Sequence, residues 1–376
     1  MQPRYLPYVL TSLLSVFSLL ILAGCTSKTE RPVAKDGNIF EEASYITATP
    51  GGDGVMDVTI LNPWDSASIL ASYHLINNEV GKGEATDGGI TLTLPLRRLI
   101  VYSSVHAALL TELGYADAIV GVADAAYIRQ PELTQRLADG RIADIGSSME
   151  PSLEKIIALH PDAILVSPFQ NAGHGVIDKA GVPVIECADY MENSPLGRAE
   201  WSKFFAMLVE GISQTNSKTY DTSRDKYLAL VEKARGYDEK PKVITEMPSN
   251  GNWLMPGGHS YAGRLLIDAG ATYPFENNTS PGSVPMSYEK AFSAAQDADF
   301  WLVKSFGEEM TLKDVARNHP LNTRIWAYNN GGIYYSDTST SNLFEETPFH
   351  PELLLADYIT IFHHTGDSLS YYRPVR

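Results

Sequence analysis

The sequence is poor in basic residues. It has 29 Lys and Arg against 45 Asp and Glu, so the formal net charge is −16. Recognition of nucleic acid needs a basic surface, and this balance argues against a nucleic-acid partner. After residue 22, no run approaches the roughly 20 apolar residues of a membrane-spanning helix. We therefore expect the remainder of the 376 residues to form a soluble protein of about two domains.

The first 25 residues are organised like an export signal. Arg4 gives a short positive start, an apolar run extends from Tyr5 to Leu22, and Leu-Ala-Gly precedes Cys25. This pattern resembles a bacterial lipoprotein signal, which implies cleavage after residue 24 and lipidation of Cys25. We assign residues 1–24 to the signal peptide and the polar residues 25–38 to a tether. The alternative is a buried cysteine at the end of an uncleaved anchor.

Cysteine is almost absent from the rest of the chain. The sequence has two cysteines, and if Cys25 carries lipid, Cys187 has no partner for an internal disulfide. Cys187 follows the apolar run at 182–185, which favours a small buried residue over a reactive thiol.

The hydrophobic pattern divides the rest of the chain into four parts. Residues 39–97 alternate apolar and polar in short runs separated by glycines, which predicts a small antiparallel β element. Strands alternate with helices over 98–194 and again over 238–376, and this predicts two doubly wound α/β lobes with parallel sheets. Apolar residues at helical spacing over 195–237 predict a helical connector. In such sheets, ligands bind beyond the carboxyl ends of the strands.

Four segments resemble one family of receptors. They are RRLIVYSSVHAALLTELGYADAIVGV, IGSSMEPSLEKIIALHPDAILVS, GRLLIDAGA and MSYEKAFSAAQDADFWLV, within residues 95–365. These segments resemble the helical-backbone class (class III) of ABC-transporter substrate-binding proteins, which take up iron-siderophores, haem and cobalamin. The resemblance implies a monomeric binding protein, not an enzyme, that needs no cofactor and is lipid-anchored on the periplasmic side of the bacterial envelope. It would deliver an iron complex (haem or ferric siderophore) to a permease dimer with its ATPase; cobalamin is the alternative ligand.

Two glutamates match positions that the family uses to dock its permease. Glu154 and Glu289 each lie in one of the resembling helix segments, one in each lobe. Two carboxylates that are far apart on one face would orient the receptor on a basic partner. The alternative is that each is an ordinary solvated helix glutamate.

Several aromatic and histidine side chains occupy the loops where ligand is expected. Planar side chains suit a large, flat, mostly apolar ligand, and an imidazole or phenolate suits iron. We expect His259 and Tyr261 as possible iron ligands, and Arg129 is the main cationic exception in these loops. His174, His363 and His364 lack the spacing of a free-metal site, so none is predicted. The predicted ligand-binding residues are His106, Tyr127, Phe169, Trp253, His259, Tyr261, Phe306 and Phe344.

The stretch Gly258-His259-Ser260-Tyr261-Ala262 also raises a different hypothesis. It is similar to the G-x-S-x-G turn of serine hydrolases, but Ala262 replaces the closing glycine and the preceding predicted strand ends far upstream. We therefore expect Ser260 to cap the helix that follows, and Pro256-Gly257-Gly258 to let the backbone approach a ligand. A secreted serine hydrolase that uses Ser260 stays as the remote alternative.

Overall fold

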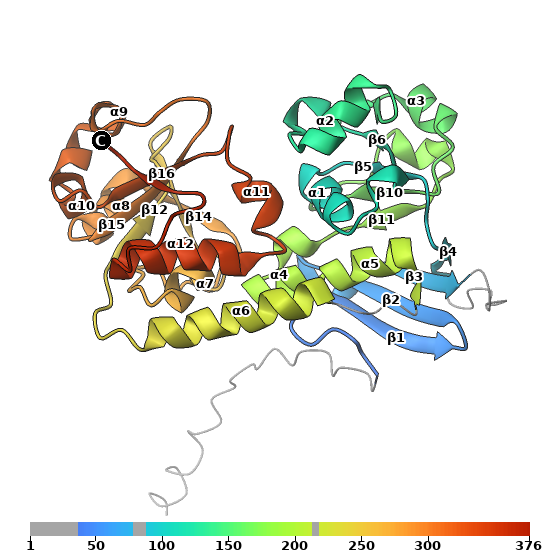
Figure 1. The fold of residues 1–376 in the computed structure, drawn as a ribbon, viewed down its shortest axis with the longest axis horizontal. Helices are drawn as coiled ribbons and strands as arrows, with labels where there is room; N and C mark the ends of the chain where they lie inside the picture. Colours follow the sequence, from blue (N-terminus) through green and yellow to red (C-terminus); the bar gives the residue numbers. More distant parts are fainter. Residues whose placement is uncertain (1–36, 78–87, 213–217) are drawn as a thin grey trace, which may run out of the picture. The chain divides into compact units, whose positions relative to one another are not determined.

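The computed structural model describes residues 37–77, 88–212 and 218–376. The predicted signal peptide, Cys25 and most of the predicted tether lie outside these residues. Two α/β lobes, a helical connector and an additional β-sheet make up the described chain (Figure 1). The predicted fold class is confirmed. Within the described residues, no helix combines the length and apolarity that a membrane crossing requires.

The N-terminal sheet has the order β1-β2-β3-β4. Its apolar residues alternate along each strand, so that Met56, Val58 and Ile60 of β2 all point into the core. The pairs β1–β2 and β2–β3 are antiparallel, but β4 is parallel to β3, so the prediction of a wholly antiparallel element is wrong. Residues 78–89 separate β3 from β4, a length that suits a parallel crossover and not a tight turn. The strands are β1 (Ile46–Gly52), β2 (Val55–Asn62), β3 (Asp65–Asn77) and β4 (Ile90–Leu94).

The N-terminal lobe has a parallel sheet of order β11-β10-β5-β6-β7. The chain starts at β5, moves outward through β6 and β7, and returns to the other side of β5 as β10. The strand order therefore reverses between β5 and β10, and such a switch point opens a crevice at the carboxyl ends of both strands. The strands are β5 (Leu99–Val101), β6 (Ile119–Val122), β7 (Ala143–Asp144), β10 (Ala163–Val166) and β11 (Val184–Glu186), with a small hairpin of β8 (Gly146–Ser147) and β9 (Glu150–Pro151); the helices are α1 (Ser104–Glu112), α2 (Pro131–Ala138) and α3 (Leu153–Ala158).

The C-terminal lobe has a smaller sheet of order β12-β15-β16-β17, whose strands follow the chain order without a reversal. The first three strands are parallel, and the last is antiparallel to β16. A separate antiparallel hairpin of β13 and β14 was not predicted. The strands are β12 (Val243–Thr245), β13 (Asn252–Pro256), β14 (Ser283–Ser287), β15 (Phe300–Ser305), β16 (Ile333–Asp337) and β17 (Arg373–Pro374); the helices are α7 (Tyr261–Asp268), α8 (Tyr288–Ala295), α9 (Leu312–Asn318), α10 (Trp326–Asn329), α11 (Leu343–Glu346) and α12 (Pro351–His363).

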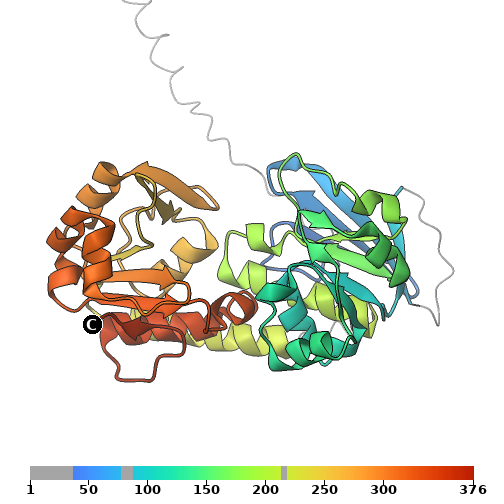
Figure 2. The ribbon, with the colours of Figure 1, turned by 90° about the horizontal axis from the view of Figure 1, so that it is seen from above.

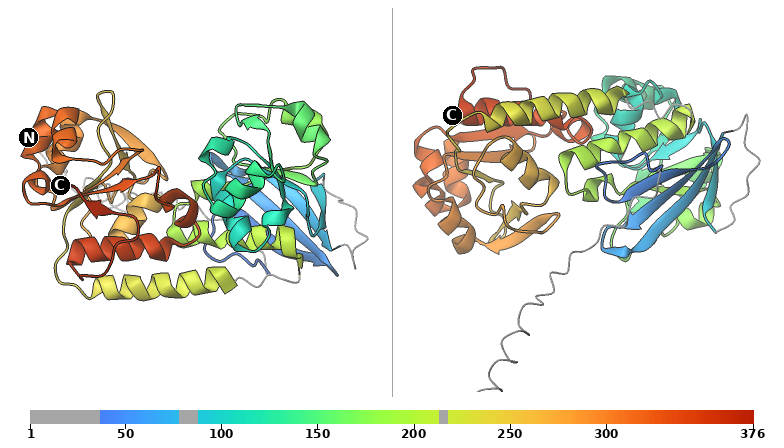
Figure 3. Two further views of the ribbon diagram at one scale, coloured as in Figure 1. Left: turned by 45° about the horizontal axis from the view of Figure 1, so that its top comes forward. Right: turned by 90° about the horizontal axis from the view of Figure 1, so that it is seen from below.

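Three helices lie between the lobes in sequence: α4 (Pro195–Glu200), α5 (Ser202–Glu210) and α6 (Lys218–Arg235). The buried side chains of α5 share one core with β1–β4 and the N-terminal lobe. In contrast, α6 runs alongside α12 and packs in the core of the C-terminal lobe (Figures 1 and 3). The connector is therefore part of both cores.

Two buried carboxylates hold the start of the described chain against the connector. Glu200 accepts hydrogen bonds from the backbone N–H groups of residues 41–43, and Glu192 accepts them from Ser44 and Tyr45. Glu192 also accepts a bond of 2.9 Å from the indole of Trp201. Burial raises the pKa of Glu192 to about 7 in spite of these donors. Residues 41–45 are thus fixed to the connector at the point where the chain enters the fold.

Candidate functional site

A cavity of about 610 Å³ lies at the switch point of the N-terminal lobe. Tyr102 and Ser103 line it from the end of β5, and Val166 and Ser167 line it from the end of β10. The segment 148–151 and the segment 172–177 form the remaining walls. We call this space the switch-point cavity. Its position is the one that the strand order predicts for a ligand.

The rim of the switch-point cavity carries apolar side chains that are open to solvent. Met149 is 82% exposed and Phe169 is 66% exposed. An exposed apolar patch beside a cavity is typical of a ligand-binding groove, whereas single exposed apolar side chains are common on any protein surface. Among the described residues that line the cavity there is no Lys or Arg. The site therefore suits a ligand with an apolar outer surface.

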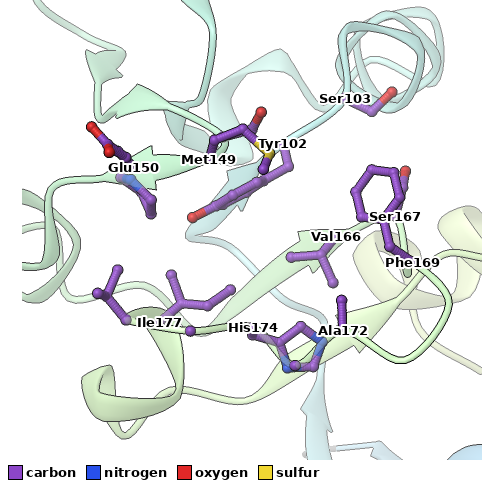
Figure 4. Close-up of a pocket in the computed structure, with 15 residues that line it drawn as sticks. Tyr102, Ser103, Met149, Glu150, Val166, Ser167, Phe169, Ala172, His174 and Ile177 are labelled. Atoms are coloured by element: carbon purple, nitrogen blue, oxygen red, sulfur yellow. The ribbon is translucent and has the colours of Figure 1, made fainter.

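Tyr102 contributes the main polar group inside the cavity. In Figure 4 its ring extends between the turn that carries Met149 and Glu150 and the segment that carries His174 and Ile177. Its hydroxyl oxygen is buried and has no hydrogen-bond partner among the described residues. Burial, with a smaller contribution from the charge of Asp124, raises the pKa of Tyr102 to about 12, so the phenol is protonated at neutral pH. An unpartnered buried hydroxyl is a group that a ligand can satisfy.

His174 forms another part of the wall and is held by two carboxylates. Its Nε2 lies 2.6 Å from Oε1 of Glu186, and its Nδ1 lies 3.2 Å from Oδ1 of Asp178. The hydrogen bond to Glu186 raises the pKa of His174, although partial burial opposes it. Because both ring nitrogens have carboxylate partners, the imidazole is oriented but is not free to bind a metal.

Four predicted ligand residues are exposed at the carboxyl ends of strands. Tyr127 follows β6, Phe169 follows β10, Phe306 follows β15, and Phe344 lies in α11 beyond β16; they are 62%, 66%, 70% and 48% exposed. Of these, Phe169 lines the switch-point cavity. Arg129 donates hydrogen bonds to the backbone oxygen of Thr338 and to Glu345. The loop after β6, which carries Tyr127, thus meets the segment after β16, which carries Phe344.

The prediction that His106 lines the ligand cleft is wrong. The residue is 1% exposed and lies on the inner face of α1. Nε2 lies 2.8 Å from Oδ1 of Asp189, and the ring packs on Phe205 with 4.8 Å between ring centroids. Asp189 also accepts a hydrogen bond from Arg198. Although burial opposes it, the charges of His106 and Arg198 hold the pKa of Asp189 below its usual range. His106 is a paired core residue.

The predictions that Trp253 and Tyr261 contact the ligand are also wrong. Trp253 is fully buried in β13, where its Nε1 donates hydrogen bonds to the backbone oxygens of Thr245 and Glu246 at 2.9 and 3.0 Å. The hydroxyl of Tyr261 donates a bond of 2.7 Å to the backbone oxygen of Thr347, and burial raises its pKa to about 12. A partly buried, protonated phenol in such a bond does not present a phenolate to iron. His259 is exposed, but it does not line the switch-point cavity.

Ser260 is the N-cap of α7, as predicted. Its Oγ accepts a hydrogen bond of 3.1 Å from the backbone N–H of Gly263 and donates one of 2.7 Å to the oxygen of Gly257. The residue is buried, so the hydroxyl is neither free nor accessible for attack on a substrate. A Cβ at Gly257 or Gly258 would lie within 2.1 Å of the backbone oxygens of Ser280 or Glu276. These glycines permit close packing against residues 276–280, and not the expected approach to a ligand.

The two predicted docking glutamates have the same local geometry. Ser152 caps α3 and Ser287 caps α8, and each serine hydroxyl accepts a hydrogen bond from the backbone N–H three residues later. Glu154 and Glu289 each occupy the second position of their helix, and both are exposed. An acidic side chain in the first helical turn is favoured by the helix dipole, which explains its place without a partner. The geometry is therefore compatible both with docking on a permease and with ordinary solvated glutamates.

No cluster for a free metal ion is found in the part of the chain that the structure describes. There, no group of three or more His, Cys, Asp or Glu side chains is arranged to hold a metal ion. His363 packs on Tyr237 with ring centroids 4.0 Å apart, and its Nε2 lies 2.9 Å from the backbone oxygen of Ala269. Cys187 is fully buried, as expected.

Sequence comparison identifies the family. The model of the periplasmic binding protein family matches residues 99–340, which is well over half of the chain. The chain belongs to this family. Its members are substrate-binding components of ABC transport systems and are not enzymes; they bind the transported ligand as cargo and require no cofactor.

Individual proteins agree with this assignment. An uncharacterized lipoprotein of Methanocaldococcus jannaschii is 27% identical over 297 residues, which cover 75% of this chain and 69% of that protein. The petrobactin-binding protein of Bacillus subtilis is 23% identical and covers 65% of this chain and 75% of its own. A periplasmic heme binding protein from Pseudomonas aeruginosa has the same fold, with a TM-score of 0.57 and 18% identity, over 75% of this chain and 98% of that one.

Proposed function

We propose that this periplasmic binding protein captures an iron complex (haem or ferric siderophore) and delivers it to the permease of an ABC importer. The observation that carries the proposal is the switch-point cavity, which is lined by the exposed side chains of Met149 and Phe169 and by Tyr102. Haem presents flat apolar faces with its polar groups at one edge, and such faces are the complement of the apolar part of this lining. Petrobactin and heme are ligands named for two of the similar proteins.

The charge of the lining narrows the choice of chelate. The described lining residues include no Lys or Arg, and the guanidinium of Arg129 is already bonded to Thr338 and Glu345. Recognition of a highly anionic chelate relies on such groups. These observations favour a complex with little exposed negative charge. Cobalamin, whose outer surface is also largely uncharged, is the second candidate.

The protein acts outside the cytoplasm in this proposal, attached by lipid on Cys25. The resemblance of the first 25 residues to a lipoprotein signal and the lipoprotein relative support the anchor. The connector belongs to both hydrophobic cores, so we propose that the lobes rotate little when ligand binds. Tyr127, Phe306 and Phe344 would extend the contact surface of the cavity to the other strand ends.

The test is a binding experiment with the purified protein from residue 26 onward. Haem, a ferric trihydroxamate and cobalamin are titrated while absorption and tryptophan fluorescence are recorded. We expect one of them to bind at 1:1 stoichiometry, and Phe169→Ala to weaken it by about tenfold, or about 1.4 kcal/mol. Trp326→Ala is the matched control, because Trp326 is an exposed aromatic of α10 away from the cavity. Failure of all three ligands to bind would reject the proposal, as would equal losses in the two variants.

A further inference from the structure

A second cavity, of about 700 Å³, lies between the N-terminal sheet and the edge of the lobe. One wall comes from β3, the opposite wall from β11 and the segment that precedes it, and Ile90 at the start of β4 also lines it. Figure 2 shows the N-terminal sheet, in blue, beside the green strands of the lobe. We call this space the sheet-edge cavity. The additional sheet therefore creates a hollow that the lobe alone would not have.

Tyr73 fixes the spacing between the two walls. Its hydroxyl donates a hydrogen bond of 3.1 Å to the oxygen of Val184 and accepts one of 2.9 Å from the N–H of Glu186. Both partners belong to β11, the edge strand of the parallel sheet. The phenol satisfies backbone groups that an edge strand leaves open. β3 is thus held beside β11 without pairing with it, and the cavity remains open next to this contact.

The sheet-edge cavity has apolar walls and an acidic end. Ile69 and Ile90 are 60% and 39% exposed, and Val182, Pro183 and Val184 line the opposite side. At the other end lie Glu186, Asp178 and His174. Two carboxylates and a single imidazole leave this end with net negative charge even when the imidazole is protonated.

Glu186 carries the carboxylate oxygen on which this inference depends. Its side chain is 9% exposed; Oε1 is bonded to His174, but Oε2 is buried and has no hydrogen-bond partner within the described part of the chain. An ionised oxygen that is removed from water without a donor is costly, so such an atom in a cavity wall points to a ligand that supplies N–H groups. The donor must be cationic to suit the charge of this end. The apolar walls suit a hydrocarbon body and not a bare metal ion.

We propose that the sheet-edge cavity is a second binding site, which takes an organic cation: an ammonium group on an apolar body. The ammonium group donates to Oε2 of Glu186, and the hydrocarbon contacts Ile69 and Ile90. His174 lines both this cavity and the switch-point cavity. An ammonium group bound in the sheet-edge cavity therefore changes the surroundings of the His174 imidazole. The site gives a role to residues 39–97 that is separate from capture of a chelate.

Benzylammonium is the probe, with benzyl alcohol and benzoate as its neutral and anionic counterparts. The protein from residue 26 onward, free of chelate, is titrated by calorimetry and by NMR of the histidine imidazoles. We expect saturable binding of benzylammonium at millimolar concentration or below, a change in the His174 signal, and at least about tenfold weaker binding of the alcohol and benzoate.

Three variants locate the site. Glu186→Gln removes the negative charge, and Ile69→Trp fills the mouth from a position that is exposed and therefore safe for folding. Each of these two variants should weaken the binding of benzylammonium by about tenfold or more. Glu276→Gln, an exposed carboxylate of the other lobe, should leave it unchanged. If Glu186→Gln does not fold, Ile69→Trp decides alone.

The proposal is overturned if benzylammonium does not saturate, if the alcohol binds equally well, or if Ile69→Trp binds as the natural sequence does. The measurement contains no chelate, so its outcome is independent of whether the switch-point cavity binds one.

Discussion

Arg129 of the N-terminal lobe donates a hydrogen bond of 2.9 Å from Nη2 to Oε1 of Glu345 in α11 of the C-terminal lobe. Its Nη1 also donates to the backbone oxygen of Thr338. Glu345 is 4% exposed and Arg129 is 27% exposed at their side chains, so the pair is largely removed from water. Phe349, a few residues later, is buried in the core of the N-terminal lobe against Phe205. The segment 338–350 thus joins the lobes a second time, in addition to the connector.

Replacing Arg129 by Met should lower the free energy of unfolding by about 2–3 kcal/mol, because the carboxylate of Glu345 would stay buried without a counter-ion. Urea denaturation of the natural and variant proteins measures this loss. The double variant Arg129→Met/Glu345→Gln should recover at least half of it, since the uncompensated charge is gone. A single variant as stable as the natural protein would show that the pair does not join the lobes.

A second interlobe pair should make stability depend on pH. Nε2 of His350 lies 2.8 Å from Oε2 of Glu112, and Nδ1 lies 3.4 Å from Oε1 of Glu352. Burial lowers the pKa of His350, but the bonds to these two carboxylates prevail and raise it to about 10. The folded pKa is above the unfolded value of 6.5, so the stabilisation is complete below 6.5 and is lost as pH rises through 10.

The measurement is the free energy of unfolding of the natural protein and of His350→Gln between pH 6 and pH 10. We expect a difference of about 1 kcal/mol at the acidic end, kept small by the exposure of Glu112, and almost none at the alkaline end. Glu112→Gln should reduce the pH dependence by removing one of the two partners. A constant difference between the natural protein and His350→Gln across this range would contradict the assignment.

Features that depend on neighbouring residues were predictable from the sequence. Ser260 is followed by a helix, and a serine before a helix caps it through a local hydrogen bond. Likewise, Tyr127, Phe169 and Phe306 follow predicted strands of parallel sheets, and this position alone places them at the edge where ligands bind. Their exposure agrees with that rule, although contact with a ligand stays a prediction.

The errors arose where the partner is distant in the sequence. His106 looked available because Asp189, which binds it in the core, lies 83 residues away. Trp253 looked like a loop residue because its strand pairs with β14, which starts 30 residues after Trp253 at Ser283. Tyr102, in contrast, is not among the predicted ligand-binding residues. Tyr102 lies at the end of β5, beside the point where the strand order reverses, and this position indicates a residue that lines a cavity.

Ser260→Ala separates the structural role of this serine from the remote hydrolase alternative. The alanine cannot accept the N–H of Gly263 or donate to Gly257, so the free energy of unfolding should fall by about 1–2 kcal/mol. Thermal denaturation measures the loss. With p-nitrophenyl esters, neither the natural protein nor the variant should show turnover above the buffer rate. Ester hydrolysis that disappears in Ser260→Ala would instead support the hydrolase.

Glu154 and Glu289 are expected to dock the receptor on its permease. Charge reversal of either, by Glu154→Arg or Glu289→Arg, should reduce uptake of the bound ligand by about tenfold or more, and the double variant should abolish it. Uptake is measured in cells or proteoliposomes that contain the permease and its ATPase. Both glutamates are exposed in the first turn of capped helices, so the loss of a favourable helix-dipole contact should cost less than about 1 kcal/mol of stability.

The comparison that decides between docking and simple solvation uses Glu276→Arg, which reverses an exposed charge outside these helix starts. If Glu154 and Glu289 are only solvated, charge reversal at all three positions should have the same small effect on uptake. Docking predicts loss at Glu154 and Glu289 alone, with ligand affinity unchanged within about twofold, because neither residue lines the switch-point cavity. A loss that grows at low ionic strength and shrinks at high ionic strength would further show that the lost interaction is electrostatic, since salt screens exposed charges.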